Sequence, residues 1–385
     1  MKIALVNHEV QLGGAEVALL RLAEGLRESF DLTATLPGDG PLTEGLARRG
    51  VHVEIVPMPA RSLAARRGES WRTMATLLGD ARLWTRSVRA LAARVRRADL
   101  VLTGSTKSHL YGGLAGRIAG RPVVWWLHDT VDRTTFGPAI RTLVRTAARR
   151  MPHRIVAVSR AAGASLGLPE GDPRLRVIYN GVRVRADSAR TRASDPVPRV
   201  GWIGRLIPSK GPDVFVDVAA ALASEVPGVE FVIVGAVDPR NEPFADEVRR
   251  RVRERGLDSR VEILGYRDDL GAVFDRLSAL AFTSVASDSL PTVVLEAMAS
   301  GVPVVAFSGG GVAEIVEEGR TGCLVDPGEV GAMVGRLAGL LRSPAERARL
   351  GEAGRTRAEE TFGWDRWIAA WREELLNLMG GVWVE

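Results

Sequence analysis

Short, almost wholly apolar segments alternate along most of this chain with longer segments of helical periodicity. The first apolar segment is KIALV at residues 2–6, and the helical pattern GGAEVALLRLAEGLRES follows it at residues 13–29. Strands read as continuous apolar runs when helices cover both faces of their sheet. The regular alternation of such strands with helices therefore predicts an α/β fold with parallel, doubly wound sheets.

The alternation is interrupted once, by the polar and aperiodic stretch VRVRADSARTRASDPVP at residues 182–198. A second alternating series starts at RVGWIG, and 385 residues are enough for two separate cores. We therefore predict a first Rossmann-like domain at residues 1–182, a linker at 183–198 and a second domain at 199–362. We expect the last segment, residues 363–385, to form a helix that returns to the first domain.

Cysteine content and the N-terminus bear on where the chain resides. Cys323 is the single cysteine, so no internal disulfide is possible and a reducing compartment fits. MKIALVNHEV reads as a strand and not as a secretory signal, and no apolar run reaches the ~18 residues of a membrane span. These features predict a cytoplasmic protein.

Charge is distributed unevenly. Residues 1–180 carry 27 Lys and Arg against 15 Asp and Glu, a balance of +12, whereas the remainder carries 25 against 31. The basic residues are nearly all arginine, and only Lys2, Lys107 and Lys210 are lysine. Such an asymmetry indicates different partners for the two halves, or a compositional bias towards arginine.

The stretch RLWTRSVRALAARVRR at residues 82–97 concentrates the basic charge, with further arginines at 61, 66 and 67. Helical spacing places four apolar side chains on one face, those of Trp84, Val88, Leu91 and Val95. One interpretation is a helix whose apolar face packs on the sheet. The alternative is peripheral contact with an anionic membrane, at the inner face, that brings a lipid-linked acceptor to the site.

Glycine and polar residues follow strands of the first series, where ligands of doubly wound sheets bind. Gly13 and Gly14 lie between the first strand and the first helix. They form either a tight turn with no ligand or a turn whose backbone comes close to a bound phosphate. The full G-x-G-x-x-G dinucleotide pattern is absent there. His128 and Asp129 follow the strand VVWWL. A histidine there either donates a hydrogen bond to a sugar hydroxyl or makes a hydrogen bond within the protein at the edge of the sheet.

The start of the second series, GWIGRLIPSKGPDV, holds two cations next to a helix start. Gly204 ends the strand, and Arg205 and Lys210 flank a proline-containing turn. The bidentate guanidinium of Arg205 and the ammonium of Lys210 could together bind a diphosphate at this place. The alternative is that both are solvated charges on a loop. Gly235 and Gly265 follow later strands and are weaker candidates for contact with a nucleotide base.

SDSLPTVVLEAMASG, residues 287–301, places two acids on either side of a turn. Asp288 precedes the turn and Glu296 lies on the following helix, on a different face from Val293, Val294, Ala297 and Met298. Glu296 can accept both hydroxyls of a ribose and Asp288 those of a sugar, while the backbone N–H groups between them suit a phosphate. That backbone belongs to Ser289, Leu290, Pro291 and Thr292. Taken singly, each acid can equally be a helix cap or a solvated charge. Gly310, Gly311 and Glu314 follow the next strand.

These motifs together resemble the retaining GT-B glycosyltransferases of family 4. The resemblance rests on GRLIPSKGPDVFVDVAAAL, DSLPTVVLEAMASGVPVVA and GGVAEIV…GRTGCLVDP, and more weakly on GGAEVALLRLAEGL, VVWWLHD and VIYNGV. It implies a GT-B fold, in which two Rossmann-like domains face each other across a cleft.

The resemblance also implies residue roles. Arg205 and Lys210 would hold the donor diphosphate, Glu296 the ribose, and His128 would lie near the anomeric carbon. Gly13 and Gly14 would line the cleft beside the donor phosphates and the acceptor. Asp288 stands where the family usually has glutamate and Ser289 where it has glycine, which leaves the donor sugar open.

The implied activity is transfer of a sugar from a UDP- or GDP-linked donor to a carbohydrate or lipid-linked acceptor, in cell-surface polysaccharide, glycolipid or glycoconjugate synthesis, with retained configuration. No Asp-x-Asp motif is present, so we expect no metal and no cofactor besides the donor substrate. One alternative is a sugar-nucleotide epimerase of the same fold. The other is a non-catalytic basic protein that binds membrane or nucleic acid, although no nucleic-acid module is recognisable and we expect no such partner.

Overall fold

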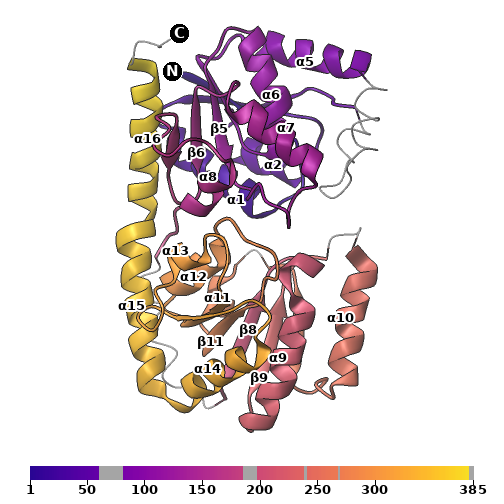
Figure 1. Ribbon diagram of the computed structural model, residues 1–385, viewed down its shortest axis with the longest axis vertical. Helices are drawn as coiled ribbons and strands as arrows, with labels where there is room; N and C mark the ends of the chain where they lie inside the picture. The colour runs from indigo at the N-terminus through magenta and orange to yellow at the C-terminus, as the bar shows by residue number, and fades with distance from the viewer. Residues whose placement is uncertain (60–80, 185–196, 238–240, 268, 381–385) are drawn as a thin grey trace. The chain divides into compact units, whose positions relative to one another are not determined.

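The structure is a computed structural model, and it describes residues 1–59, 81–184, 197–237, 241–267 and 269–380. The described chain divides into two compact units (Figure 1). Unit 1 comprises residues 1–180 together with the C-terminal segment that starts at Trp367, and unit 2 comprises residues 181–366. Most of the expected linker, and the arginines at 61, 66 and 67, lie outside the described residues.

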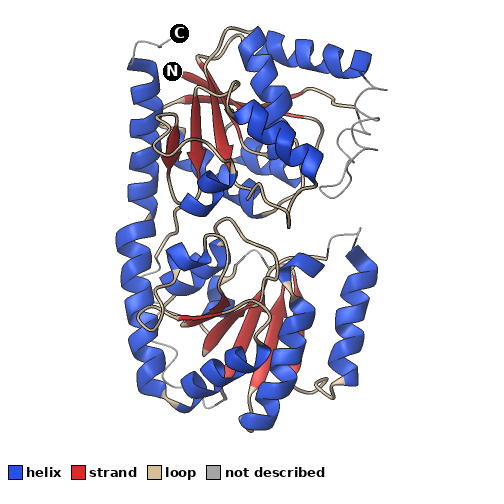
Figure 2. Cartoon of the chain, in the orientation of Figure 1, coloured by secondary structure: helices blue, strands red, loops and turns tan. Residues whose placement is uncertain are grey.

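Unit 1 is a seven-stranded, wholly parallel sheet with helices around it (Figure 2). Its strands are β1 Lys2–Val6, β2 Asp31–Leu36, β3 His52–Ile55, β4 Leu100–Thr103, β5 Val123–Leu127, β6 Arg154–Ala157 and β7 Leu175–Val177. Its helices are α1 Gly14–Leu26, α2 Pro41–Arg48, α5 Ala81–Val95, α6 Thr106–Ile118, α7 Pro138–Ala148, α8 Arg160–Ser165 and α16 Trp364–Gly380, whose first residues belong to unit 2.

Unit 2 is a six-stranded parallel sheet built in the same way. Its strands are β8 Arg199–Ile203, β9 Glu230–Val234, β10 Val261–Gly265, β11 Ala279–Phe282, β12 Val304–Phe307 and β13 Cys323–Val325. Its helices are the 3₁₀ turn η2 Pro208–Lys210, α9 Pro212–Glu225, α10 Glu242–Glu254, α11 Gly271–Phe274, α12 Thr292–Ala299, α13 Val312–Ile315, α14 Val330–Arg342 and α15 Pro344–Phe362.

Both sheets reverse their strand order at one place. The order is β3-β2-β1-β4-β5-β6-β7 in unit 1 and β10-β9-β8-β11-β12-β13 in unit 2. The first strand of each series, β1 or β8, therefore lies in the interior of its sheet. The next strands of the chain are added on one side of it, and the later strands on the other side. Loops that leave β1 and β4, or β8 and β11, run to opposite faces and leave space for a ligand between them. The predicted α/β, doubly wound class is confirmed for both units.

Apolar periodicity accounts for the cores. The interior strands are nearly continuous in buried residues; all four residues of β4, β11 and β12 are buried, for example. The edge strands β3, β7 and β10 contain no fully buried residue. On α5, Val88, Leu91 and Val95 are each at most 2% exposed, and Trp84 packs against the same cluster. The apolar face of this helix packs within unit 1, as its spacing predicts.

The C-terminal helix α16 packs on the strands of unit 1. Trp371 is completely buried and meets the Trp126 ring of β5 edge-on, with 5.0 Å between ring centroids. Arg154 Nε of β6 lies 2.6 Å from Glu374 Oε1, and both side chains are less than a fifth exposed. Helix α16 therefore packs on β5, the strand that His128 follows.

The two ends of unit 2 meet in the backbone. The Val182 N–H donates to the Phe362 carbonyl at 2.8 Å, and the Trp364 N–H donates to the Val182 carbonyl at 3.0 Å. The Arg183 guanidinium lies over the Trp364 ring, 3.9 Å from its centroid. Within the described ranges, no helix is long and apolar enough to cross a membrane.

Candidate active site

The carboxyl edge of unit 2 at the β8–β11 switch point gathers the residues predicted to bind the donor. Gly204, Arg205 and Lys210 follow β8, and the segment from Asp288 to Pro291 lies between β11 and α12, which starts at Thr292. The predicted residues thus come from two loops that lie 70 or more positions apart in the chain.

These two loops are bonded to each other. The Ser209 carbonyl accepts hydrogen bonds from the Val285 and Ala286 N–H groups at 3.1 and 3.2 Å. The Thr283 hydroxyl donates to the Gly211 carbonyl at 2.7 Å, and the Ser284 hydroxyl donates to the Ser209 carbonyl at 3.0 Å. Buried hydrogen bonds of this kind hold the start of α9 against the end of β11.

Gly211 makes this approach possible. Its φ of +65° lies in the left-handed region, and a Cβ atom there would lie 2.1 Å from the Thr283 carbonyl oxygen. Any other L-residue would combine an unfavourable backbone conformation with a steric overlap. Glycine at 211 therefore fixes where Lys210 stands.

Lys210 and Asp288 form an ion pair through Nζ and Oδ2. The side chains are 28% and 12% exposed, so the pair is largely shielded from water. Arg205 differs, because it is exposed and makes no ion pair with any described residue. The structure therefore brings two predicted site residues into direct contact and leaves the third accessible to a ligand.

Helix α12 starts at Thr292, directly after Pro291. Leu290 is 4% exposed and anchors the turn, while Glu296 is partly buried in the second turn of the helix. Val294, Ala297 and Met298 are buried, as the helical spacing predicts, and Val293 is partly buried. The free N–H groups at the start of α12 carry the positive end of the helix dipole.

The weaker candidates Gly235 and Gly265 lie on the neighbouring loops. The Gly235 N–H donates to the Gly265 carbonyl at 2.8 Å, and the Gly204 N–H donates to the Val234 carbonyl at 2.9 Å. Backbone hydrogen bonds therefore join the loops that hold these three glycines along one edge of the sheet.

The corresponding edge of unit 1 is strongly polar. His8 Nδ1 lies 2.6 Å from the Ser105 hydroxyl, which joins the loop after β1 to the loop after β4. The Tyr111 hydroxyl donates to the Asn7 carbonyl at 2.8 Å. Gly13 and Gly14 follow, and α1 starts at Gly14.

Glu16 was not among the predicted site residues, yet it organises this edge. It is 7% exposed, and its carboxylate accepts from Asn7 Nδ2 at 3.2 Å and from the Gly13 N–H at 3.1 Å. Burial raises the pKa of Glu16, and the Asn7 hydrogen bond acts in the opposite direction. Only the carboxylate half of a capping box is present, because the N-cap Gly13 has no side chain, so the S/T-x-x-E sequence signal that would have identified Glu16 is missing.

His128 lies at the end of β5, where it was predicted. Its ring is 4.2 Å from the Trp126 ring, centroid to centroid, and burial lowers the pKa of His128 to about 4. The neighbouring Asp129 accepts a hydrogen bond from the Thr106 hydroxyl at 2.6 Å. At neutral pH the imidazole is therefore uncharged, and it can serve as a hydrogen-bond partner but not as a cation.

His109 is a second buried histidine of unit 1, only 1% exposed and stacked on Trp125 at 4.8 Å. Burial lowers the pKa of His109 to about 3, and its Nδ1 lies 2.7 Å from the Thr103 hydroxyl. The unfolded chain takes up a proton near pH 6.5 and the folded chain does not, so stability falls as pH drops below 6.5.

We expect acidification from pH 7 to 5 to cost up to about 2 kcal/mol at His109, at ~1.4 kcal/mol per pH unit below 6.5. Urea unfolding at both pH values should show a smaller loss for His109→Gln than for the wild type. His52→Gln is the matched control, because His52 is exposed in the same unit. Equal pH dependence in the wild type and His109→Gln would contradict the prediction.

Among the described residues, no group of three or more His, Cys, Asp or Glu side chains is arranged to hold a metal ion. Arg205, Lys210 and the N–H groups at the start of α12 are positively charged or polarised groups at this edge of unit 2.

Comparison with known proteins places the chain in a family. Residues 12–185 match the family described as Glycosyltransferase Family 4, and residues 197–343 match Glycosyl transferases group 1. The D-inositol 3-phosphate glycosyltransferase of Streptomyces scabiei is 30% identical over 302 residues, covering 71% of this chain and 67% of that protein. This chain belongs to the group 1, family 4 glycosyltransferases. The resemblance inferred from the motifs is thereby confirmed.

Two further relatives cover more of this family 4 chain. The 2-deoxystreptamine N-acetyl-D-glucosaminyltransferase of Streptomyces fradiae is 28% identical over 369 residues, covering 88% of this chain and 84% of that one. The crystal structure of Anabaena HepE in complex with UDP and glucose has a TM-score of 0.84 and 25% identity, covering 98% of this chain and all of that one. Its match confirms the GT-B architecture. By contrast, the chain spans about half the length of the first mycobacterial D-inositol 3-phosphate glycosyltransferases that it matches.

Proposed function

We propose that this family 4 chain is a retaining glycosyltransferase that moves a sugar from a nucleoside-diphosphate sugar to a hydroxyl acceptor. The observation that carries the proposal is the convergence of Arg205, Lys210, Asp288 and the start of α12 at one switch point of unit 2. Binding of UDP and glucose by the similar HepE supports a UDP-linked donor.

The residue roles follow from charge and position. Arg205 and Lys210 hold the diphosphate and stabilise the negative charge that develops as it departs. Backbone N–H groups from Ser289 to Thr292 contact phosphate, Glu296 accepts the ribose hydroxyls, and Asp288 contacts the donor sugar. Gly204, Gly235 and Gly265 line the base side. We infer no metal, because these cations and the helix dipole supply the positive charge.

The acceptor is assigned to unit 1. His128, which is neutral at pH 7, accepts or donates a hydrogen bond next to the anomeric carbon. The Gly13–Gly14 turn, whose Gly13 N–H is bound by Glu16, lines the acceptor side of the site. In this proposal the leaving phosphate takes the proton of the acceptor hydroxyl, so neither Asp288 nor Glu296 is a general base.

A donor panel tests the function. UDP-glucose, UDP-N-acetylglucosamine, GDP-mannose and their free diphosphates are compared by thermal shift, and release of nucleoside diphosphate is then followed with and without a sugar or lipid-linked acceptor. Saturation at ~100 times the dissociation constant stabilises the fold by roughly 2.7 kcal/mol. Acceptor-dependent release supports the transferase. Release independent of any acceptor, or epimerised donor, would favour the epimerase alternative.

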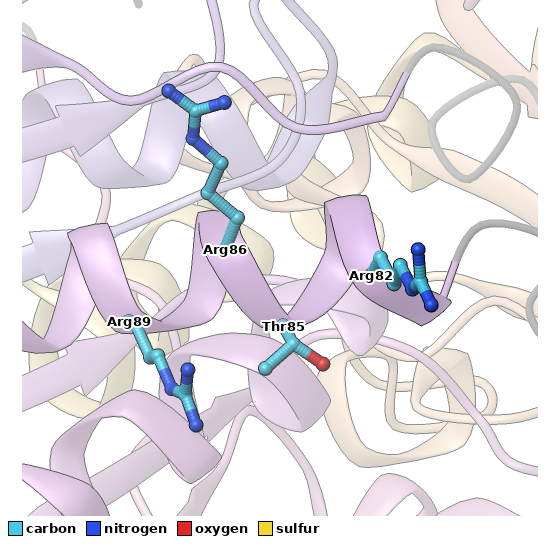
Figure 3. A pocket seen from close by; sticks show the side chains of 4 residues that line it. All are labelled: Arg82, Thr85, Arg86 and Arg89. Atoms are coloured by element: carbon cyan, nitrogen blue, oxygen red, sulfur yellow. The ribbon is translucent and has the colours of Figure 1, made fainter.

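We further propose that α5 contacts an anionic membrane at the cytoplasmic face and so brings a lipid-linked acceptor near. Arg82, Arg86 and Arg89 line a pocket of about 410 Å³ on this helix (Figure 3), and none makes an ion pair with a described residue. The apolar Leu83 beside them is 56% exposed. Exposed arginines attract anionic headgroups, and an exposed leucine between them can enter the headgroup region.

Flotation with vesicles tests this contact. The wild type should float with vesicles of anionic phosphatidylglycerol at low salt and not with neutral phosphatidylcholine, and Arg82→Glu/Arg86→Glu/Arg89→Glu should abolish flotation. The matched control reverses three arginines of α10, Arg249, Arg250 and Arg253, of which the first two are paired with acids of their own helix. Equal loss in both triple variants would show a non-specific charge effect.

A further inference from the structure

The contact between Lys210 and Asp288 joins two residues to which the proposed function gives different ligands. Lys210 faces the diphosphate in that proposal, whereas Asp288 faces the sugar. In the structure each is the partner of the other, in a pair that is 28% and 12% exposed. Because a charge pair shielded from water interacts more strongly than one on the surface, anything that takes Lys210 from Asp288 must compete with this contact.

Both partners are held in position by their backbones. The Lys210 N–H donates to the Ile207 carbonyl at 3.0 Å, and the preceding carbonyl, that of Ser209, accepts two N–H groups of the β11 loop. The Asp288 carbonyl accepts from the Gly311 N–H at 2.8 Å. Gly310 has a φ of +56°, and a Cβ atom there would lie 2.0 Å from that same carbonyl oxygen. These contacts restrain both backbones, so we expect the pairing of Lys210 with Asp288 to change through the side chains.

The two cations of the predicted clamp consequently differ. Arg205 is exposed and makes no ion pair within the described ranges, so its whole charge is available to a phosphate. Lys210 has a carboxylate bound already. A diphosphate at this edge can therefore bind Arg205 without displacing another group, but to bind Lys210 it must compete with the Asp288 carboxylate.

We infer that the donor diphosphate exchanges places with the Asp288 carboxylate on Lys210, and that Asp288 is thereby released to accept the hydroxyls of the donor sugar. The inference rests on the proposed function and specifies how the two halves of the donor are bound. Asp288 is a positioning residue for Lys210 before the exchange and a sugar ligand after it. The coupling opposes binding of the diphosphate alone and favours a diphosphate that carries a sugar, because only the latter gives Asp288 a new partner.

UDP and uridine, measured by calorimetry, test the exchange. Asp288→Asn removes the competing charge, so UDP should bind about 10-fold more tightly than to the wild type, within the usual range of coupling between ligands. Uridine, which has no phosphate, should bind equally to both and reports that the variant is folded. Asp288→Glu keeps the charge and should bind UDP as weakly as the wild type.

A double-variant cycle separates exchange from simple repulsion between Asp288 and phosphate. In a Lys210→Met background there is no ammonium to share, so adding Asp288→Asn should change UDP affinity by less than about twofold. Equal gains in both backgrounds, or no gain in the Asp288→Asn variant, would overturn the exchange while UDP binding still supported the proposed function. Failure of the wild type to bind either UDP or GDP would overturn the proposed function and the exchange together.

Discussion

Replacing Arg205 or Lys210 by alanine is expected to lower turnover by about 100-fold or more, on the scale of removing one group that stabilises charge in the transition state. Both side chains extend from the loop after β8 at the β8–β11 switch point, where the proposed leaving group carries its charge. The loss should fall mainly on kcat, because charge on the diphosphate increases as the glycosidic bond breaks. Initial rates with a saturating UDP-sugar measure it.

Arg253→Ala provides the control for that experiment, because Arg253 is an exposed arginine on α10 of the same unit. Its turnover should equal that of the wild type. Near-normal turnover in both the Arg205 and the Lys210 variants would contradict the assignment of this edge as the diphosphate site.

Gly211→Ala is expected to lower the stability of unit 2 strongly. It combines a φ of +65° with a Cβ atom 2.1 Å from the Thr283 carbonyl, which must move away from the start of α9. Left-handed backbone at a non-glycine residue costs roughly 1–2 kcal/mol, and forced repacking adds about 1–3 kcal/mol. We therefore expect a loss of about 3 kcal/mol in urea unfolding, together with weaker donor binding.

Gly256→Ala is a matched control for the backbone conformation. Gly256 has a φ of +67°, and no atom lies within 4 Å of the position that its Cβ would take. This variant should lose only the roughly 1–2 kcal/mol of the left-handed conformation and keep normal donor binding. If the two alanine variants were equally stable, the tight contact between Gly211 and Thr283 would not be the constraint that places Lys210.

Much of the fold follows from local sequence. Runs such as DLTATL and VEILG become β2 and β10 with the same bounds, because an apolar run between turn signals has few alternatives in a parallel sheet. The spacing of Val88, Leu91 and Val95 indicated the buried face of α5 correctly. The strand orders were not predictable in this way, since pairing depends on contacts between distant segments.

The candidate site was predictable residue by residue but not as a set of contacts. Glycines, a lysine and an aspartate after strands identify the edge, because parallel strands share one carboxyl end. The pairing of Lys210 with Asp288 spans 78 positions, and nothing local in either loop indicates it. Glu16 and His109 were missed for a related reason. Each is a polar residue on a helix, and its burial becomes apparent only when the ends of β1 and β4 are placed beside it.

The backbone junction of Val182 with Phe362 and Trp364 has a consequence for synthesis on the ribosome. Unit 2 is a continuous stretch whose two ends meet, so it can complete its fold as soon as its own residues have emerged. Unit 1 is discontinuous, and Trp126 receives its cover only when Trp371 has been added. We therefore expect unit 2 to finish folding first during synthesis, while Trp126 on β5 of unit 1 stays exposed until α16 has been made.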